Sequence, residues 1–342
     1  MDANPVLVEL TRGNWVENRH RAAFVVRDAV GNIIARAGDT ARPVFPRSAV
    51  KSMQALAIFT SGADRRFSLT DEELALACAS HQGEPAHTEG VNHFLAHLGL
   101  GVADLECGAH APTAASAREA LRERHERPTA LFNNCSGKHS GMLATSLALG
   151  APTLGYVGRE HPTQVAVREA IETAIGEKLS LDRVGTDGCS IPTWAAPLDA
   201  FALGFARMAT GEGLSPEIGA AARRIFDAAT SHPFLVGGSN NLDSDAMAAF
   251  GGRLMLKGGA EGVYCGAIRD KGWGFALKID DGSGPASRAL VAALLLELAA
   301  PNAAQAALLE AHATQPIRNV RSLDVGTLAA RREAVRAAVL QA

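Results

Sequence analysis

A serine and a lysine three positions apart, Ser48 and Lys51, are the first residues of this 342-residue chain whose types and spacing could do chemistry. They stand at the predicted start of a helix, where the i, i+3 spacing puts both side chains on one face. A helix start also supplies free backbone N–H groups and a positive dipole end. A neutral lysine there can deprotonate the serine while the N–H groups receive an oxyanion. A serine that caps a helix, followed by a solvated lysine, gives the same pattern, so the pair alone is weak evidence for a catalytic site.

A second lysine, Lys257, ends a strand-like segment and precedes Gly258 and Gly259. The glycines would bring bare backbone close to a ligand beside the amine. This arrangement resembles the Lys-Thr-Gly element that accompanies Ser-x-x-Lys in penicillin-recognising enzymes. The alternative is an exposed lysine before a turn. The co-occurrence and order of the two motifs favour the chemical interpretation.

Two of the five cysteines, Cys135 and Cys189, lie in polar, glycine-rich segments rather than among apolar residues. Such thiols are candidate nucleophiles or metal ligands. With His139 or Asp187 they would make a plausible zinc set, although no Cys-x2-Cys pair is present. From these residues alone, two unrelated turn cysteines are the simpler interpretation.

Composition and charge exclude several classes of function. The chain is 47% hydrophobic and 20% charged, as globular proteins are, and its net charge of −3 provides no basic field for nucleic acid. The apolar run 289–296 is too short to cross a bilayer, and no secretory signal is visible at the N-terminus. An odd number of widely spaced cysteines argues against a disulfide framework. We therefore expect a cytoplasmic protein that binds neither nucleic acid nor a membrane.

Strand-like segments near both ends of the chain enclose a long helical middle. The sequence predicts strands at 22–26, 33–37, 253–256, 263–265 and 274–279, and helices at 48–59, 71–79, 88–98, 115–126, 136–149, 162–175, 216–229, 285–299 and 328–341. This order indicates an α+β fold with an antiparallel sheet made from both chain ends. We expect one unit over 1–342, with a helical middle of about 48–250 on a sheet formed from about 5–45 and 253–280.

Together, these motifs make the chain similar to the rhizobial-type (class 3) L-asparaginases. Five segments carry the resemblance, in the family's order: Arg47-Ser48-x-x-Lys51-x-x-Gln54, Ala79-Ser80-His81-x-Gly83-Glu84, Asn133-Asn134-Cys135-Ser136-Gly137-Lys138-His139, Asp187-Gly188-Cys189 with Pro192-Thr193, and Lys257-Gly258-Gly259-Ala260-Glu261-Gly262. Five separate motifs are far more specific than any one of them.

The resemblance implies a serine β-lactamase-like fold, usually in a homodimer, that hydrolyses L-asparagine to L-aspartate and ammonia. It implies two catalytic pairs, Ser48 with Lys51 and Ser80 with Lys257. It further implies a zinc site at the positions of Cys135, Lys138 and Cys189, with His139 as our second choice of ligand. The resemblance and the motifs place six more residues in substrate-binding or supporting positions: Arg47, His139, Asp187, Gly258, Gly259 and Glu261.

One segment departs from the family pattern. Many members carry Gly-Arg before an aspartate where this chain has Asn240-Asn241-Leu242-Asp243, which affects fine substrate contacts. We expect Ser48 to attack the side-chain amide, although sequence does not decide which serine attacks. The alternatives are a glutaminase or broad amidohydrolase, a penicillin-interacting hydrolase, and a non-catalytic, zinc-stabilised asparagine-binding protein.

Overall fold

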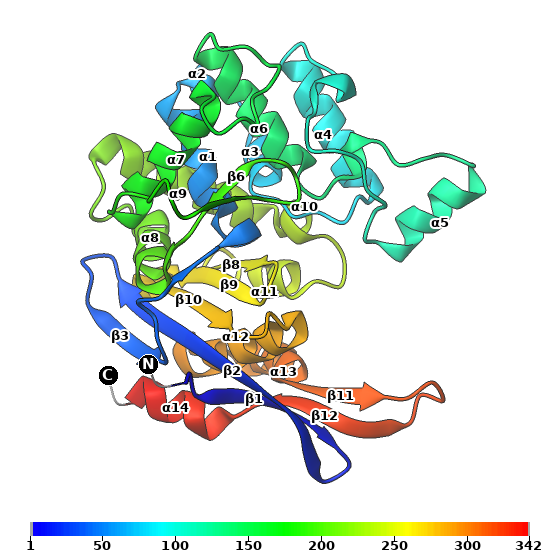
Figure 1. Cartoon of the computed structure of the whole chain (residues 1–342), viewed down its shortest axis with the longest axis vertical. Coiled ribbons are helices and arrows are strands. Elements are labelled where there is room, and N and C mark those ends of the chain that lie inside the picture. The colour runs from blue at the N-terminus through cyan, green and yellow to red at the C-terminus, as the bar shows by residue number, and fades with distance from the viewer. Residues whose placement is uncertain (1–2, 341–342) are drawn as a thin grey trace.

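The computed structural model of the chain describes residues 3–340, and Figure 1 shows helices stacked above a sheet with further helices below it. The strands of the large sheet are β1 (Val6–Arg12), β2 (Trp15–Asp28), β3 (Ile33–Ala37), β8 (Leu254–Gly259), β9 (Val263–Ile268), β10 (Trp273–Ile279), β11 (Thr314–Arg318) and β12 (Asp324–Ala330). Their order is β11-β12-β1-β2-β10-β9-β8, all pairs are antiparallel, and β3 pairs with β2. The predicted α+β fold with a sheet made from both chain ends is confirmed.

The long strand β2 joins the two parts of this sheet. Its first half pairs with β1, from Arg21 opposite Val6, and its second half pairs with β10, from Ala22 opposite Ile279. The second half is an unbroken apolar run, which suits a strand that is covered on both faces. The first half, from Trp15 to His20, is mostly exposed and polar.

Helices cover both faces of the sheet. The helices between the strands are α1 (Lys51–Thr60), α2 (Ala63–Arg66), α3 (Asp71–Ala77), α4 (Pro85–His97), α5 (Ala115–Glu123), α6 (Ser136–Ala148), α7 (Pro162–Ile175), α8 (Leu198–Thr210), α9 (Pro216–Ser231), α10 (Pro233–Gly237) and α11 (Leu242–Phe250). Those after β10 are α12 (Gly284–Leu298), α13 (Ala303–Ala313) and α14 (Arg332–Leu340). α8 packs on β2, β9 and β10, and α12 packs on β1, β9, β10 and β12. Among the described residues, no helix is both long and apolar enough to span a membrane.

Short elements connect these layers. They are β4 (Pro43–Val44), which pairs with β7 (Ala196–Pro197), β5 (Val184–Thr186), which pairs with β6 (Pro192–Trp194), and the 3-10 helices η1 (Arg47–Val50), η2 (Val102–Asp104), η3 (Ala130–Phe132) and η4 (Arg269–Lys271). The β4–β7 pair ties the segment before η1 to the segment before α8.

Several helix boundaries follow from local chemistry that the sequence shows. Thr70 and Glu73 form the expected capping box at the start of α3. α7 begins at Pro162 and ends before Gly176, whose φ of 79° is the left-handed conformation of a glycine C-cap.

Two expectations about the C-terminal part need correction. The sheet also includes β11 and β12, which lie beyond the range 253–280 expected to complete it. The helix expected at 328–341 begins at Arg332, because residues 328–330 pair with β1 instead. Residue 341 lies outside the described residues.

Candidate active site

The residue before Ser48 has an unusual backbone conformation. Arg47 has a φ of 52°, a left-handed value that costs about 1–3 kcal/mol for a non-glycine residue. Its guanidinium binds Oδ1 of Asp187 at 2.8 Å, through both Nε and a terminal nitrogen. The pKa of Asp187 is lowered: burial alone would raise it, but the N–H of Gly188 and the charges of Lys138 and Arg47 outweigh burial. Asp187 therefore fixes the segment that presents Ser48.

The end of β8 lies directly against η1, which carries Ser48. A Cβ on Gly259 would lie 2.7 Å from the carbonyl oxygen of Pro46 and 3.2 Å from the amide nitrogen of Ala49. Only a residue without a side chain fits this contact. The close approach at Gly259 is thus to the backbone of η1, whereas the sequence analysis expected an approach to a ligand, and it brings the strand end next to Ser48.

The buried lysine of α1 contacts Ser80 rather than Ser48. Lys51 is 1% exposed, and its Nζ donates to Oγ of Ser80 at 2.9 Å and to the carbonyl of Ala79. Burial lowers its pKa, which favours the neutral amine that a general base requires. The expected pairs, Ser48 with Lys51 and Ser80 with Lys257, are therefore not the hydrogen-bonded pairs of this structure. The reason is that the segment after α3 places the Ala79 carbonyl and the Ser80 hydroxyl against the amine of Lys51.

Lys257 is paired with an acid that the sequence analysis did not assign to the site. Its Nζ lies 3.8 Å from Oδ2 of Asp243 and donates to the carbonyl of Gly258 at 3.0 Å. The same carboxylate oxygen accepts from the N–H of Gly258 at 2.9 Å. Burial lowers the pKa of Lys257 to about 8, against the opposing attraction of Asp243. In the sequence, the only indication of this acid was that Asp243 ends the segment that departs from the family pattern.

The two predicted thiol ligands and Lys138 converge at the start of α6. The amine of Lys138 lies 2.9 Å from Sγ of Cys189, and the thiols of Cys135 and Cys189 are hydrogen-bonded to each other. A Cβ on Gly137 would lie 2.3 Å from the carbonyl oxygen of Leu76, so this glycine lets α6 approach the end of α3. That approach places the thiol pair next to the segment of Ser80.

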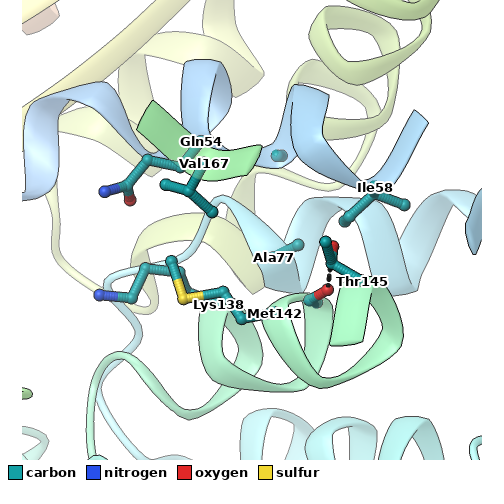
Figure 2. Close-up of a pocket in the computed structure, with 9 residues that line it drawn as sticks. Gln54, Ile58, Ala77, Lys138, Met142, Thr145 and Val167 are labelled. Atoms are coloured by element: carbon teal, nitrogen blue, oxygen red, sulfur yellow. Dashed lines mark hydrogen bonds between the residues drawn. The ribbon is translucent and has the colours of Figure 1, made fainter. Parts of the chain in front are cut away.

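Figure 2 shows how the stem of Lys138 is held. It lies beside Met142 on α6, with Gln54 of α1 and Val167 of α7 opposite, around a cavity of about 10 Å³. The amine of Lys138 and the amide of Gln54 point to the same side, away from Thr145. An apolar cage around the stem therefore fixes where the amine ends.

The thiols of Cys135 and Cys189 and the amine of Lys138 shift one another's pKa values. The hydrogen bond from Cys189 holds the pKa of Cys135 well below its usual range, with help from the lysine charges, although burial opposes it. Burial alone would lower the pKa of Lys138, but Cys135 and Cys189 raise it. The hydrogen bond with Cys135 and burial raise the pKa of Cys189, so the negative charge lies on Cys135. A metal site would need both thiols deprotonated.

Two predicted site residues lie outside this group. The Nδ1 atom of His139 lies 2.6 Å from the hydroxyl of Tyr156, and the imidazole lines neither of the compartments described below. Glu261 is an exposed residue with a φ of 62° in the β8–β9 turn. His139 faces Tyr156 because the residue after Lys138 points about 100° away around α6.

These elements enclose two adjoining compartments that share Ser48, Asn134 and Ala260. The smaller, which we call the thiol compartment, has a volume of about 260 Å³ and is lined by Arg47, His110, Cys135, Asp187 and Cys189 among others. The larger, which we call the serine compartment, has a volume of about 590 Å³. Its lining includes Ser48, Ser80 and Lys257, together with residues that sequence analysis did not place there: Asp243, Tyr264, Ser287, Arg288 and His312.

Two of the donors that the family resemblance assigns to zinc, Cys135 and Cys189, line the thiol compartment, and the third, Lys138, has its amine beside Cys189. Cys135, Lys138 and Cys189 would supply two sulfurs and one nitrogen, and the compartment leaves space for a further ligand. Among residues 3–340, no cluster of three or more histidine, cysteine or acidic side chains could hold a metal. A zinc ion at this position would need the amine of Lys138 as its third ligand, and the residues present fit such an ion.

Comparison with known protein families identifies the family of this chain. The sequence profile described as L-asparaginase II matches residues 8–330. The chain belongs to the L-asparaginase II family. A search of curated proteins finds no match.

Solved structures with a similar fold include Mglu and a β-lactamase from Mycobacterium bovis. Mglu is 16% identical with a TM-score of 0.41, and the alignment covers 77% of this chain and 62% of Mglu. The β-lactamase is 17% identical with a TM-score of 0.42, and the alignment covers 81% of this chain and 94% of the β-lactamase. The chain thus spans less than two thirds of the length of Mglu.

Proposed function

We propose that the protein hydrolyses L-asparagine to L-aspartate and ammonia through a covalent aspartyl–serine ester. One observation carries the proposal: in an L-asparaginase II family member, Ser48, Ser80 and Lys257 line one compartment, and the buried Lys51 is hydrogen-bonded to Ser80. Lysine-activated serines are an established means of acyl transfer.

The first half-reaction forms the ester. Oγ of Ser48 attacks the side-chain amide carbon of asparagine, and its proton passes to the neutral amine of Lys51. Lys51 lies one helical turn further along, and its burial favours the neutral form. The backbone N–H of Ser48 receives the negative charge that develops on the amide oxygen.

Collapse of the tetrahedral adduct completes the ester and releases ammonia, and hydrolysis of the ester is the second half-reaction. The C–N bond breaks, and the departing nitrogen takes a proton from Lys51 through the hydroxyl of Ser80, with which Lys51 shares its hydrogen bond. Ammonia leaves. A water then attacks the ester carbon, its proton returns through the same groups to Ser48, and L-aspartate is released.

We further propose a zinc ion at Cys135, Lys138 and Cys189. Bound there, it would act as a Lewis acid that orients the polar end of the substrate, and it would stabilise the site. Homodimerisation and a cytoplasmic location follow from the family resemblance and the sequence composition, and they stay predictions.

Ammonia release from L-asparagine and L-glutamine, measured side by side with and without added zinc, tests the proposed function. We expect release mainly from L-asparagine. Equal use of both amides would assign a broad amidohydrolase, since a pocket distinguishes one methylene by only about 1–3 kcal/mol. Folded, zinc-supplied protein that releases ammonia from neither would contradict hydrolysis and favour an asparagine-binding protein.

A further inference from the structure

An arginine without a protein partner faces the compartment of the two serines. Arg288, on the second turn of α12, is half-buried and lines the serine compartment together with Ser48 and Ser80. No residue between 3 and 340 forms a hydrogen bond or ion pair with its guanidinium. A partly desolvated charge without a partner is unfavourable, and a bound anion would relieve that cost.

The one carboxylate that lines the compartment is already engaged. Oδ2 of Asp243 accepts from the N–H of Gly258 and lies 3.8 Å from the amine of Lys257, and its charge also acts on Tyr264. Burial and this carboxylate raise the pKa of Tyr264, which keeps the phenol protonated and able to donate. Asp243 therefore leaves the guanidinium of Arg288 free to bind a ligand.

The fold directs this guanidinium toward the N-terminal end of α12. A Cβ on Gly284, one turn earlier, would lie 3.8 Å from a terminal nitrogen of Arg288, so the side chain extends back over Gly284. Gly284 and Ser287 line the same compartment. The positive end of the α12 dipole thus reinforces the guanidinium charge. In Figure 1, α12 lies beside α13, which contributes His312 to the same lining.

The charges around the compartment favour an anionic group on the ligand. Arg288 and Lys257 face it against the single carboxylate of Asp243, and Asn240 and Asn241 are neutral. Among the described residues that line the serine compartment, Arg288 is the only arginine. The reacting amide of asparagine is uncharged, whereas its α-carboxylate is an anion with two parallel oxygens. A guanidinium binds such a group through two parallel hydrogen bonds.

We propose that Arg288 binds the α-carboxylate of the substrate and so restricts the enzyme to free or C-terminal asparagine. An asparagine inside a peptide chain lacks this carboxylate and is rejected. This inference rests on the proposed function and adds to it the group that selects the substrate.

β-Alaninamide, which is asparagine without its α-carboxylate, gives the test its reference substrate. For Arg288→Met we expect kcat/KM for L-asparagine to fall by about 10–100-fold, mainly through KM, since a hydrogen bond to a charged group contributes about 1.5–3 kcal/mol. The slow turnover of β-alaninamide should not change. Arg288→Lys keeps the positive charge but not the planar guanidinium with its two parallel N–H donors. Its kcat/KM for L-asparagine should therefore lie between those of the wild type and Arg288→Met. Arg122→Met, on the exposed α5, is the matched control and should resemble the wild type.

Three other results would overturn the inference. An equal loss on both substrates would assign Arg288 a structural role, and no loss on L-asparagine would remove it from the binding site. Failure of the wild type to release ammonia from either amide would instead sink the proposed function. In that case calorimetric binding of L-aspartate decides: tighter binding to the wild type than to Arg288→Met supports the carboxylate site, and equal or absent binding overturns it.

Discussion

The amine nitrogen of Lys51 lies 2.9 Å from the hydroxyl of Ser80, a residue on a different segment, although Ser48 is only three residues away, in the preceding 3-10 helix η1. This hydrogen bond joins the start of α1 to the segment that leaves α3. Lys51 is thus hydrogen-bonded to one candidate serine and follows the other by three residues along the chain. The roles of the two serines therefore differ by position: Ser48 has the helix N-terminus, and Ser80 has the direct contact with the base.

Replacement of each serine should separate these roles. Ser48→Ala should abolish turnover, because the attacking oxygen is lost. Ser80→Ala should retain Ser48 and lose only proton relay, which is worth about 10²–10⁴-fold. The measurement is ammonia release combined with mass spectrometry of acid-quenched enzyme, where an aspartyl adduct should appear with Ser80→Ala.

Ser52→Ala is a suitable control because Ser52 is buried on α1 but lines neither compartment. An adduct on Ser48→Ala, together with none on Ser80→Ala, would reverse the assignment and make Ser80 the nucleophile.

Metal content should depend on the two thiols of the thiol compartment. Wild-type protein is expected to hold about one zinc per chain at a set of this kind, and Cys135→Ala or Cys189→Ala should lose it. The melting temperature should fall on chelation only where the metal was bound, because a ligand that binds the folded state alone stabilises it. Elemental analysis and thermal unfolding measure both effects.

Cys265→Ala gives the matched control, since Cys265 is equally buried but lies on β9 away from the thiols. If Cys135→Ala and Cys189→Ala hold as much zinc as Cys265→Ala, the metal assignment fails.

The motifs that were visible in sequence are those in which neighbouring residues set the geometry. Lys257-Gly258-Gly259 could be interpreted because strand, amine and close backbone approach are consecutive. Arg288 could not, because it stands within an apolar helical pattern and only the packing of α12 on the sheet brings it to the serine compartment. The hydrogen bond between Lys51 and Ser80 likewise depends on tertiary packing, since 28 other residues separate the two along the chain.

The same distinction applies to the fold. The second half of β2 is a plain apolar strand, but its first half is polar and carries no such pattern. β11 contains Pro316, which weakens a strand prediction, and its pairing with β12 at the sheet edge accommodates it. α8, α11 and α13 were not predicted, and their positions are set by packing on the sheet and on one another.

Lys257 should make stability depend on pH in the alkaline range. Its pKa is lowered by burial to about 8 in the folded protein, from an ordinary value of 10.5. Between these values the unfolded chain binds more protons, so the unfolding free energy rises with pH, by at most about 3 kcal/mol. Below pH 8 the amine is protonated in both states, and its contribution does not change with pH.

Lys257→Met should remove this rise. Unfolding free energies from denaturant titrations between pH 7.5 and 10.5 should show a wild-type curve that climbs relative to the variant. Lys271→Met, at an exposed site, is the control and should follow the wild type. Parallel curves for wild type and Lys257→Met would contradict a lowered Lys257 pKa.

Gly259 should matter more for activity than its distance from the reacting groups suggests. In Gly259→Ala, the new methyl would meet the backbone of Pro46 and Ala49 at 2.7 and 3.2 Å, so β8 and η1 must move apart. That movement displaces Lys257 relative to Ser48, and misplacement by about 1 Å can cost 10²-fold in rate. Stability should fall by about 1–3 kcal/mol, as for other overpacked sites.

Gly101→Ala makes the same chemical change at a control position. The new methyl has no atom within 4 Å and the residue has an extended φ of −140°, so neither the rate nor the stability should change. Steady-state kinetics and thermal unfolding of both variants measure the difference, and a Gly259→Ala enzyme with wild-type kcat would show that the β8–η1 contact does not position the catalytic groups.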